Sequence, residues 1–274
     1  MLIFSFLFGL AVGSFLNAAV FRVRWPSQGS LVRGRSHCPR CHTTLPWYDL
    51  IPLVSFAILG RRCRFCRKPI SWQYPLVELA TALLFTLALY FPATIELTSL
   101  TSLTSLFIRW FSISVLLFLF VFDLKYGLLP DHVTIPAIII VFLGAVTTRS
   151  LGSPSGSLGM TVWDYSFSLL GAVMLGALFF AFQYFLSRGH WVGGGDIRMG
   201  ALVGAIAGWP GVLVALGLSY LIGAVAAILL ILAGKKKLRG DSLPMGPFLA
   251  LGALTVIFFG DRIVEAVLYP YKFL

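Results

Sequence analysis

Eight long apolar runs, separated by polar segments, constrain this sequence more than any other feature. The runs are 2–21, 74–91, 103–122, 133–148, 166–187, 197–209, 211–233 and 245–268. An α-helix needs about 20 mainly apolar residues to cross the hydrocarbon core of a bilayer, which is about 30 Å thick. Only 11% of the residues are charged, whereas a soluble domain has about 25%. The pattern therefore predicts an all-α integral membrane protein with about eight transmembrane helices.

Turn-forming residues separate several of these runs, at 26–29, 152–156 and 208–211. The run 197–209 is the shortest and would measure about 20 Å as a helix. We therefore expect this helix to begin earlier, at the preceding glycines, or to lie where the bilayer is thin. We find no internal repeat and no low-complexity tract.

The charges between the runs predict the orientation in the membrane. No Lys or Arg precedes the first run, whereas two follow it, which is the reverse of a cleavable signal peptide. We therefore expect a permanent anchor with the N-terminus outside and the segments 22–73, 123–132, 188–196 and 234–244 in the cytosol. With the adjacent Arg198, these segments carry every Lys and Arg except Arg109, Arg149, Arg262 and Lys272. This asymmetry follows the positive-inside rule.

The formal net charge of +11 would suggest a nucleic-acid ligand in a soluble protein. Here the basic residues lie between apolar runs, where such residues fix topology and contact anionic lipid head groups. We therefore expect the lipid bilayer, and no nucleic acid, to be the partner of the basic segments.

All four cysteines lie in the first predicted cytosolic loop, as Cys38-Pro-Arg-Cys41 and Cys63-Arg-Phe-Cys66. Two CxxC pairs at this kind of spacing are typical of a tetrahedral structural zinc site. Neighbouring arginines and a lysine favour the thiolate form that binds metal. Such a site would fold a loop that has little apolar core of its own.

Three alternatives to a four-cysteine zinc site remain open. Disulfides would require an oxidising compartment, whereas the charges place this loop in the cytosol. The string Cys38-Pro-Arg-Cys41-His42 also matches a c-type haem attachment motif, but haem would leave the second pair without a role. A mixed site could use His37 or His42 as a ligand.

Two aspartates stand where apolar runs meet the predicted cytosolic side. Asp123 ends the third run and Asp196 opens the sixth. An ionisable group next to an apolar span is costly and is by default a functional candidate. Two carboxylates that share one proton can hydrolyse an amide, because the ionised one accepts a proton from water while the neutral one polarises the carbonyl. The alternative is that each aspartate is an isolated helix-end residue, solvated or capping. Asp131, after a proline, is interpreted first as a helix cap and only second as a catalytic residue.

Glycines follow Asp196 at steps of four, as Gly200, Gly204 and Gly208. Small residues at this spacing let a second helix approach closely, so we expect this stripe to face the helix bundle. Three glycines also precede Asp196, and their backbone freedom suits a peptide that lies close to the main chain.

These motifs together resemble the bifunctional type IV prepilin peptidases, also called prepilin leader peptidase/N-methyltransferases, over nearly the whole chain. The resemblance rests on Gly13-Ser-Phe-Leu-Asn17, the CxxC pairs, Ile51-Pro-Leu53, Tyr74-Pro-Leu-Val-Glu78, Asp123 with Pro130-Asp131, Gly193-Gly-Gly-Asp196 and Pro244-Met-Gly-Pro-Phe-Leu249. The chain departs from the family pattern at Arg198, where a lysine is expected, and at Leu50 and Met245.

The resemblance implies an enzyme of the bacterial inner membrane. It would remove the leader of prepilins and pseudopilins after a glycine on the cytosolic side, with Asp123 and Asp196 as the catalytic pair of a GxGD-type protease. It would then methylate the new N-terminal amine with S-adenosylmethionine. Zn²⁺ would be held by Cys38, Cys41, Cys63 and Cys66. We expect residues 1–100 to serve methyl transfer and residues 101–274 to form a six-helix peptidase domain.

Methyl transfer has the weakest support in the residues themselves. The sequence has no glycine-rich loop of the nucleotide-binding kind, so the residues that bind S-adenosylmethionine stay unknown. Glu78, at the inner end of the second run, is a candidate for holding the substrate amine. Its alternative is a carboxylate that stabilises a helix N-terminus.

Three other functions fit parts of the pattern. A proton- or cation-coupled transporter would use membrane carboxylates but would predict inverted repeats. A non-enzymatic assembly factor with a zinc-binding loop would tolerate Asp→Asn at both positions. A GxGD membrane protease without methylase activity would lack the four-cysteine loop.

Overall fold

The computed structural model describes residues 1–24, 35–91, 100–151, 161–234 and 243–268. The turn clusters at 26–29 and 152–156 and the basic stretch 235–237 lie outside these residues. The chain comprises two compact units, Met1–Tyr90 and Phe91–Leu274. The described elements of both units are helices, and the only bridges between extended residues are isolated ones. The all-α prediction is therefore confirmed, whereas the functional division at residue 100 stays a prediction.

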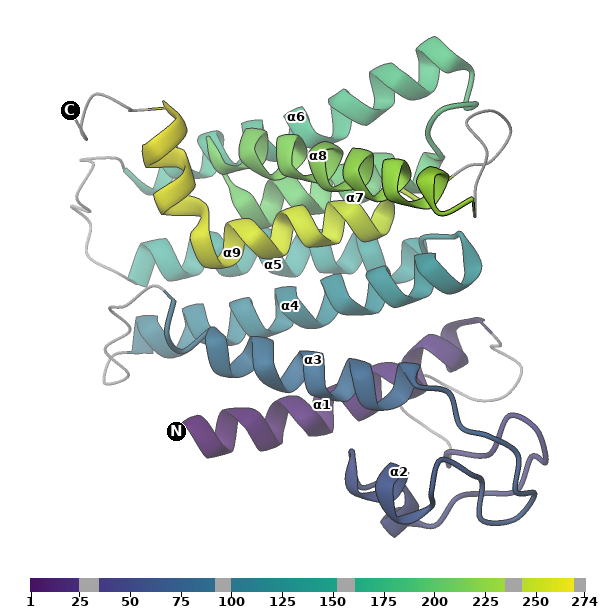
Figure 1. The fold of residues 1–274 in the computed structure, drawn as a ribbon. Coiled ribbons are helices and arrows are strands. Elements are labelled where there is room, and N and C mark those ends of the chain that lie inside the picture. The colour runs from purple at the N-terminus through teal and green to yellow at the C-terminus, as the bar shows by residue number, and fades with distance from the viewer. Residues whose placement is uncertain (25–34, 92–99, 152–160, 235–242, 269–274) are drawn as a thin grey trace. The chain divides into compact units, whose positions relative to one another are not determined.

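The first unit consists of two long helices and an irregular loop with two short helical turns. Its elements are α1 (Leu2–Arg24), η2 (Trp47–Leu50), α2 (Val54–Ile58) and α3 (Gln73–Leu87). Helices α1 and α3 lie side by side (Figure 1). They approach so closely at Gly9 that a Cβ there would lie 2.6 Å from the Cα of Ala82. Small residues permit such contacts between membrane helices, where dispersion forces replace hydrophobic burial.

A polar contact fixes the relative position of α1 and α3. The Asn17 side chain is buried and its Nδ2 donates to the carbonyl oxygen of Tyr74 over 3.1 Å. Gln73 in turn donates to the Asn17 Oδ1 over 3.3 Å. These bonds satisfy the buried amide, which would otherwise be costly.

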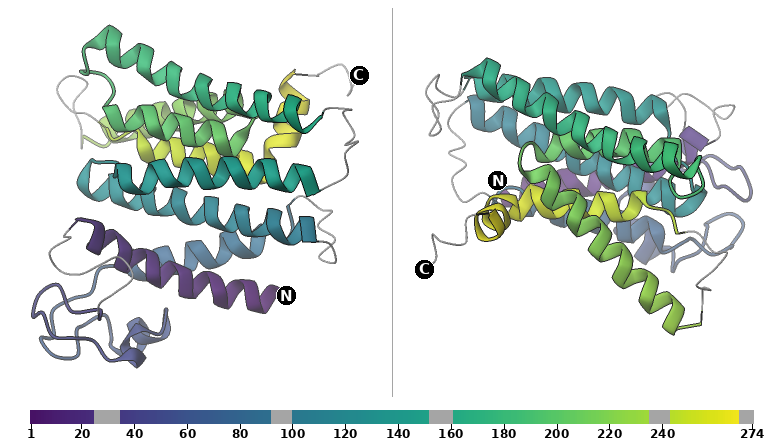
Figure 2. Two further views of the ribbon diagram at one scale, coloured as in Figure 1. Left: turned by 180° about the vertical axis from the view of Figure 1, so that it is seen from behind. Right: turned by 90° about the horizontal axis from the view of Figure 1, so that it is seen from above.

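Within its described residues, the second unit is a bundle of six helices (Figures 1 and 2). They are α4 (Leu100–Tyr126), α5 (Asp131–Leu151), α6 (Val162–Ser187), α7 (Gly194–Ala207), α8 (Gly211–Leu232) and α9 (Gly246–Leu268). Helix α7 is enclosed at its centre, since every residue from Met199 to Ala205 is buried. Large apolar side chains on the outer helices, such as Trp163, Phe182 and Leu232, are exposed. Exposed apolar side chains of this size suit contact with lipid.

Helix α7 packs on α6 through glycine, as the stripe predicts. A Cβ on Gly200 would lie 2.3 Å from the carbonyl oxygen of Gly176, and one on Gly204 would lie 2.3 Å from that of Ala172. Gly208 has a different role, because it ends α7 with a φ of +60°. Glycine adopts this left-handed conformation without a Cβ clash.

Six helices of the described residues are long and apolar enough to cross a membrane: Leu2–Arg24, Thr101–Tyr126, Asp131–Ser150, Val162–Ser187, Gly211–Leu232 and Gly246–Val267. The other two expected spans are α3 and α7, which have 15 and 14 residues. At about 1.5 Å per residue they are shorter than the ~30 Å core. Helix α7 does begin at the glycines before Asp196, as expected. The count of eight spans stays a prediction.

Candidate active site and metal centre

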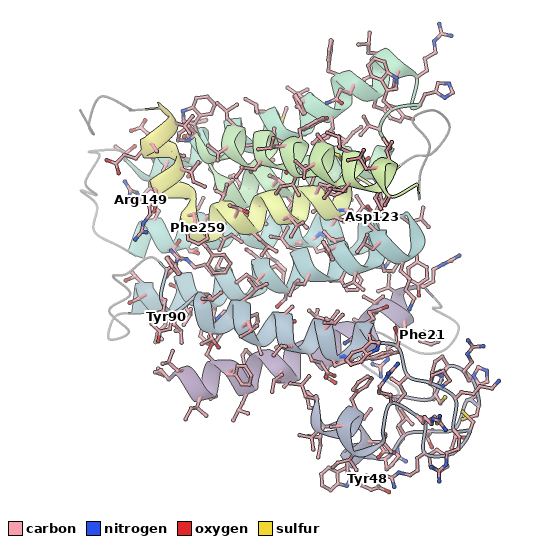
Figure 3. The ribbon with its side chains drawn as sticks, in the orientation of Figure 1. Phe21, Tyr48, Tyr90, Asp123, Arg149 and Phe259 are labelled. Atoms are coloured by element: carbon pink, nitrogen blue, oxygen red, sulfur yellow. The ribbon has the colours of Figure 1, made fainter. Side chains whose placement is uncertain are left out.

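Asp123 lies near the C-terminal end of α4, beside the start of α9 (Figure 3). Its side chain is buried, with 5% of the residue exposed. One carboxylate oxygen, Oδ2, accepts a hydrogen bond from the backbone N–H of Gly246 over 3.0 Å. Gly246 is the first residue of α9, so its N–H is one of the amides that a helix N-terminus leaves without an intrahelical partner. The helix start thus binds the carboxylate and favours its negative charge.

Asp196 is the third residue of α7 and is partly exposed. Its Oδ2 accepts a hydrogen bond from the backbone N–H of Gly193 over 2.9 Å. This contact is a capping interaction. One oxygen of the Asp196 carboxylate therefore has the capping role that is the alternative to catalysis in the sequence analysis. A capping bond through one oxygen is compatible with chemistry at the other, because a carboxylate has about four acceptor positions.

The fold brings the two aspartates together from α4 and α7. Helices α5 and α9 each pack against both α4 and α7. The Asp123 carboxyl consequently lies within range of the negative charge of Asp196. Two acid groups that interact electrostatically at the end of a helical bundle are candidates for a pair that shares one proton. Their catalytic role stays a prediction.

Asp131 is placed differently from these two residues. It opens α5, and its carboxylate forms an ion pair with Arg198 of α7. A carboxylate neutralised by a guanidinium is poorly suited to share a proton with another acid. The pair therefore favours a role in holding α5 against α7.

The four cysteines form one cluster in the loop of the first unit. Their Sγ atoms all lie within 4.8 Å of one another, and the Sγ atoms of Cys38 and Cys66 are 3.9 Å apart. None of the four is in a disulfide. Tetrahedral zinc with Zn–S bonds of about 2.3 Å sets its sulfur atoms roughly 3.8 Å apart. The donor set and spacing therefore fit a metal ion, and neither His37 nor His42 belongs to the cluster.

The two cysteine pairs have the same backbone hydrogen bonds, a repeat that the sequence did not reveal. In the first pair, Cys38 N–H donates to the Thr43 carbonyl and His42 N–H donates to the Cys38 carbonyl. In the second pair, Cys63 donates to Lys68 and Arg67 donates to Cys63. His42 and Arg67 also share a left-handed backbone, with φ of 56° and 58°. The loop is thus two copies of one turn that present their thiols to a common point.

The surroundings of two cysteines favour their thiolate forms. Hydrogen bonds from the side chain and the backbone of Thr43 lower the pKa of the Cys41 thiol to about 6. A hydrogen bond from the backbone of Cys66 lowers the pKa of the Cys63 thiol. Because metal ions bind thiolates, the surroundings of Cys41 and Cys63 suit a metal site. At Cys66, a backbone hydrogen bond from Lys68 is outweighed by burial and by hydrogen bonds with the other three thiols, which raise the pKa of the Cys66 thiol to about 11.

Two contacts of these sites were not predicted from the sequence. The Gly246 amide next to Asp123 is one, because the motif that contains Gly246 indicates the family resemblance but no contact with Asp123. The other is a bidentate ion pair in which Arg64, between Cys63 and Cys66, contacts Asp49 at 2.7 Å. Only 3% of the Asp49 side chain is exposed. An isolated acidic residue in a polar loop gave no signal for such a pair.

Comparison with known proteins identifies two family models on this chain. The Bacterial Peptidase A24 N-terminal domain matches residues 7–91, and the Type IV leader peptidase family matches residues 110–228. The comparison with solved structures found no match.

Several curated relatives share the name prepilin leader peptidase/N-methyltransferase. The Bacillus subtilis (strain 168) protein is 35% identical over 266 residues, which are 97% of each chain. The Pseudomonas aeruginosa protein is 31% identical over 96% of this chain and 92% of its own. The Myxococcus xanthus protein is 38% identical over 84% of this chain, which spans 63% of that relative's length. These matches do not favour the transporter alternative. The chain belongs to the type IV leader peptidase family.

Proposed function

We propose that Asp123 and Asp196 are the catalytic pair of a prepilin leader peptidase/N-methyltransferase in the bacterial inner membrane. The enzyme cleaves the leader of type IV prepilins or pseudopilins after a glycine and methylates the new N-terminal amine. Cleavage takes place on the cytosolic side, where the charge asymmetry of the sequence puts the inner ends of α4 and α7.

The observation that carries the peptidase proposal is the convergence of two acid groups from separate helices. Asp123 and Asp196 come from α4 and α7, and the charge of one reaches the carboxyl of the other. Each also accepts a backbone N–H, from Gly246 and Gly193 respectively. These bonds fix the carboxylates while leaving acceptor positions for water and substrate.

The chemistry follows from a proton shared between the two carboxyl groups. The ionised group accepts a proton from a bound water, whose oxygen attacks the scissile carbonyl carbon. The neutral group donates a hydrogen bond to the carbonyl oxygen and stabilises the charge that develops on it. The pair titrates as a unit, so neither residue is assigned the proton. Proton transfer to the leaving amine then completes cleavage of the C–N bond.

The cysteine cluster holds Zn²⁺ in this proposal. Four thiolates close the coordination shell, so the metal is structural and has no open position for substrate. The four thiols would hold the two CxxC turns together through this ion and so stabilise the fold of the loop. S-adenosylmethionine supplies the methyl group, but no set of described residues is assigned to hold it.

The experiment is cleavage of a prepilin peptide by the purified full-length chain and by Asp123→Asn and Asp196→Asn variants. Each variant is expected to lose at least about 100-fold in cleavage rate, the lower end of what a general acid or base contributes. Asp131→Asn is the matched control, because it also neutralises an aspartate at this end of the bundle and should lose less than about fivefold. If the Asp123→Asn or the Asp196→Asn variant cleaved the peptide at the wild-type rate, that residue would not be part of the mechanism.

A further inference from the structure

Three segments of the first unit that are far apart in the sequence meet at Glu78. The segments are the middle of α1, the loop around residues 50–53, and α3. Glu78 lies in the second turn of α3, so it is not a carboxylate of the first helical turn. Only 7% of the residue is exposed. The interpretation of Glu78 as a helix N-terminal charge is therefore replaced by that of a buried acid in a polar cluster.

The contacts of Glu78 come from both other segments. Its Oε2 accepts a hydrogen bond from the backbone N–H of Leu53 over 2.9 Å. The Ser14 side chain on α1 also hydrogen-bonds the carboxylate. The Ser14 Oγ lies 3.5 Å from the carbonyl oxygen of Leu50. We call Ser14, Leu50, Leu53 and Glu78 the Glu78 cluster.

The backbone around the Glu78 cluster is specialised. Leu53 adopts a φ of +61°, which an L-residue with a large side chain rarely does. This conformation directs its N–H at Glu78. Gly13 lets α1 approach, since a Cβ there would lie 2.7 Å from the Cα of Glu78. Strained backbone of this kind persists where the surrounding structure imposes it, often at binding sites.

The charge of Glu78 has no protein counter-ion in the described part of the first unit. The salt bridges there and in the second unit join Arg64 with Asp49 and Arg198 with Asp131. A buried carboxylate normally pairs with a cation, because two neutral hydrogen bonds replace only part of its lost hydration. A cation bound at the cluster would therefore compensate the charge of the Glu78 carboxylate.

The acceptors of the Glu78 cluster match the donors of a primary ammonium group. Such a group has three N–H donors and no acceptor. The cluster offers the Glu78 carboxylate, the Ser14 hydroxyl oxygen and the Leu50 carbonyl oxygen. Leu50 and Ile51 are exposed, at 38% each, so the cluster borders the surface of the loop.

We propose that the Glu78 cluster binds the free α-amino group of the cleaved substrate and positions it for methylation. This inference rests on the proposed N-methyltransferase function. It assigns the amine-binding step to Glu78, which pairs with the ammonium form, with Ser14 and the Leu50 carbonyl as further acceptors. The Glu78 carboxylate then accepts one ammonium proton, so that the neutral amine can attack the methyl group of S-adenosylmethionine and S-adenosylhomocysteine leaves.

The test uses full-length protein and a synthetic peptide that already begins at the mature N-terminus, so it does not depend on Asp123 or Asp196. Glu78→Gln keeps the side-chain size and an oxygen that can accept from Leu53. We expect this variant to raise the KM for the peptide at least tenfold, to lower its methylation at least 50-fold and to leave the KM for S-adenosylmethionine unchanged. Glu265→Gln, a neutralised carboxylate on α9, is the matched control and should match wild type.

Binding without methyl donor gives a second readout. Wild type should bind the free-amine peptide at least tenfold more tightly than its N-acetylated form, whereas Glu78→Gln should not discriminate between them. Equal binding of both peptides by wild type, or wild-type methylation kinetics in Glu78→Gln, would overturn the proposal. If Glu78→Gln fails to fold, Ser14→Ala decides: it should bind the free-amine peptide three- to tenfold more weakly than wild type does and bind the acetylated form equally well, and unchanged binding of the free-amine peptide would overturn the proposal. The cleavage rates of the Asp123→Asn and Asp196→Asn variants test only the peptidase proposal, so failure of one proposal can be told from failure of the other.

Discussion

The backbone amide of Gly246 lies 3.0 Å from the Asp123 Oδ2 and donates a hydrogen bond to it. A Cβ at Gly246 would lie 2.6 Å from the same oxygen. The N-terminus of α9 thus lies so close to the Asp123 carboxylate that no side chain fits at Gly246. This contact couples the position of α9 to the orientation of one member of the proposed catalytic pair.

The Gly246→Ala variant is expected to displace the Asp123 carboxylate without removing any acid. A shift of about 1 Å at a catalytic group can cost on the order of 100-fold in rate, so prepilin cleavage should fall at least about tenfold. Gly217→Ala on α8 is the matched control, because a Cβ there meets nothing within 4 Å. Equal rates for the two variants would show that the Gly246 contact is unimportant for cleavage.

The crossing of α6 and α7 gives a prediction for stability. Gly200→Ala places a methyl group against the Gly176 carbonyl and the Phe180 ring, and the helices must separate. Overpacking of this kind costs about 1–3 kcal/mol. Gly171→Ala on α6, where a Cβ meets no neighbour within 4 Å, should leave the free energy of unfolding unchanged or raise it by up to about 1 kcal/mol, because alanine favours a helix more than glycine does. Thermal unfolding in detergent compares the two, and a Gly200→Ala variant as stable as Gly171→Ala contradicts the packing.

Metal analysis tests the cysteine cluster. We expect one zinc ion per chain, lost when Cys38 and Cys63 are both changed to serine, because each CxxC turn then keeps a single thiolate. His42→Asn should retain the metal, since His42 lies outside the cluster and asparagine tolerates its left-handed backbone. Loss of zinc in His42→Asn would instead indicate mixed ligation, and bound haem would exclude a zinc site.

The parts of the structure that the sequence predicts are those set by residue type and spacing. Apolar length predicts the helices, and the CxxC spacing predicts one cluster of four thiols. The glycine stripe predicts a close helix contact, which Gly200 and Gly204 make. Gly208 does not, because a four-residue step rotates about 40° around an α-helix and the third glycine has left the packed face. It ends the helix instead.

The sequence could not predict contacts made by the main chain. The amides of Gly246 and Leu53 bind Asp123 and Glu78, but every residue other than proline carries such a donor, so no letter of the sequence marks them. The number of membrane spans is ambiguous for a similar reason. Burial of α7 inside the second unit allows a helix shorter than the bilayer to be as apolar as one that crosses it.

The paired turns at Cys38–Cys41 and Cys63–Cys66 lie on either side of the segment that contains Leu50 and Leu53. A metal ion that joins the turns closes this segment into a ring and restricts the conformations open to it. The metal–sulfur bonds would close the loop that contains Leu53 and would help to hold the Leu53 amide against Glu78. A structural ion that does not contact the substrate would in this way limit the motion of the Glu78 cluster, which binds the substrate amine.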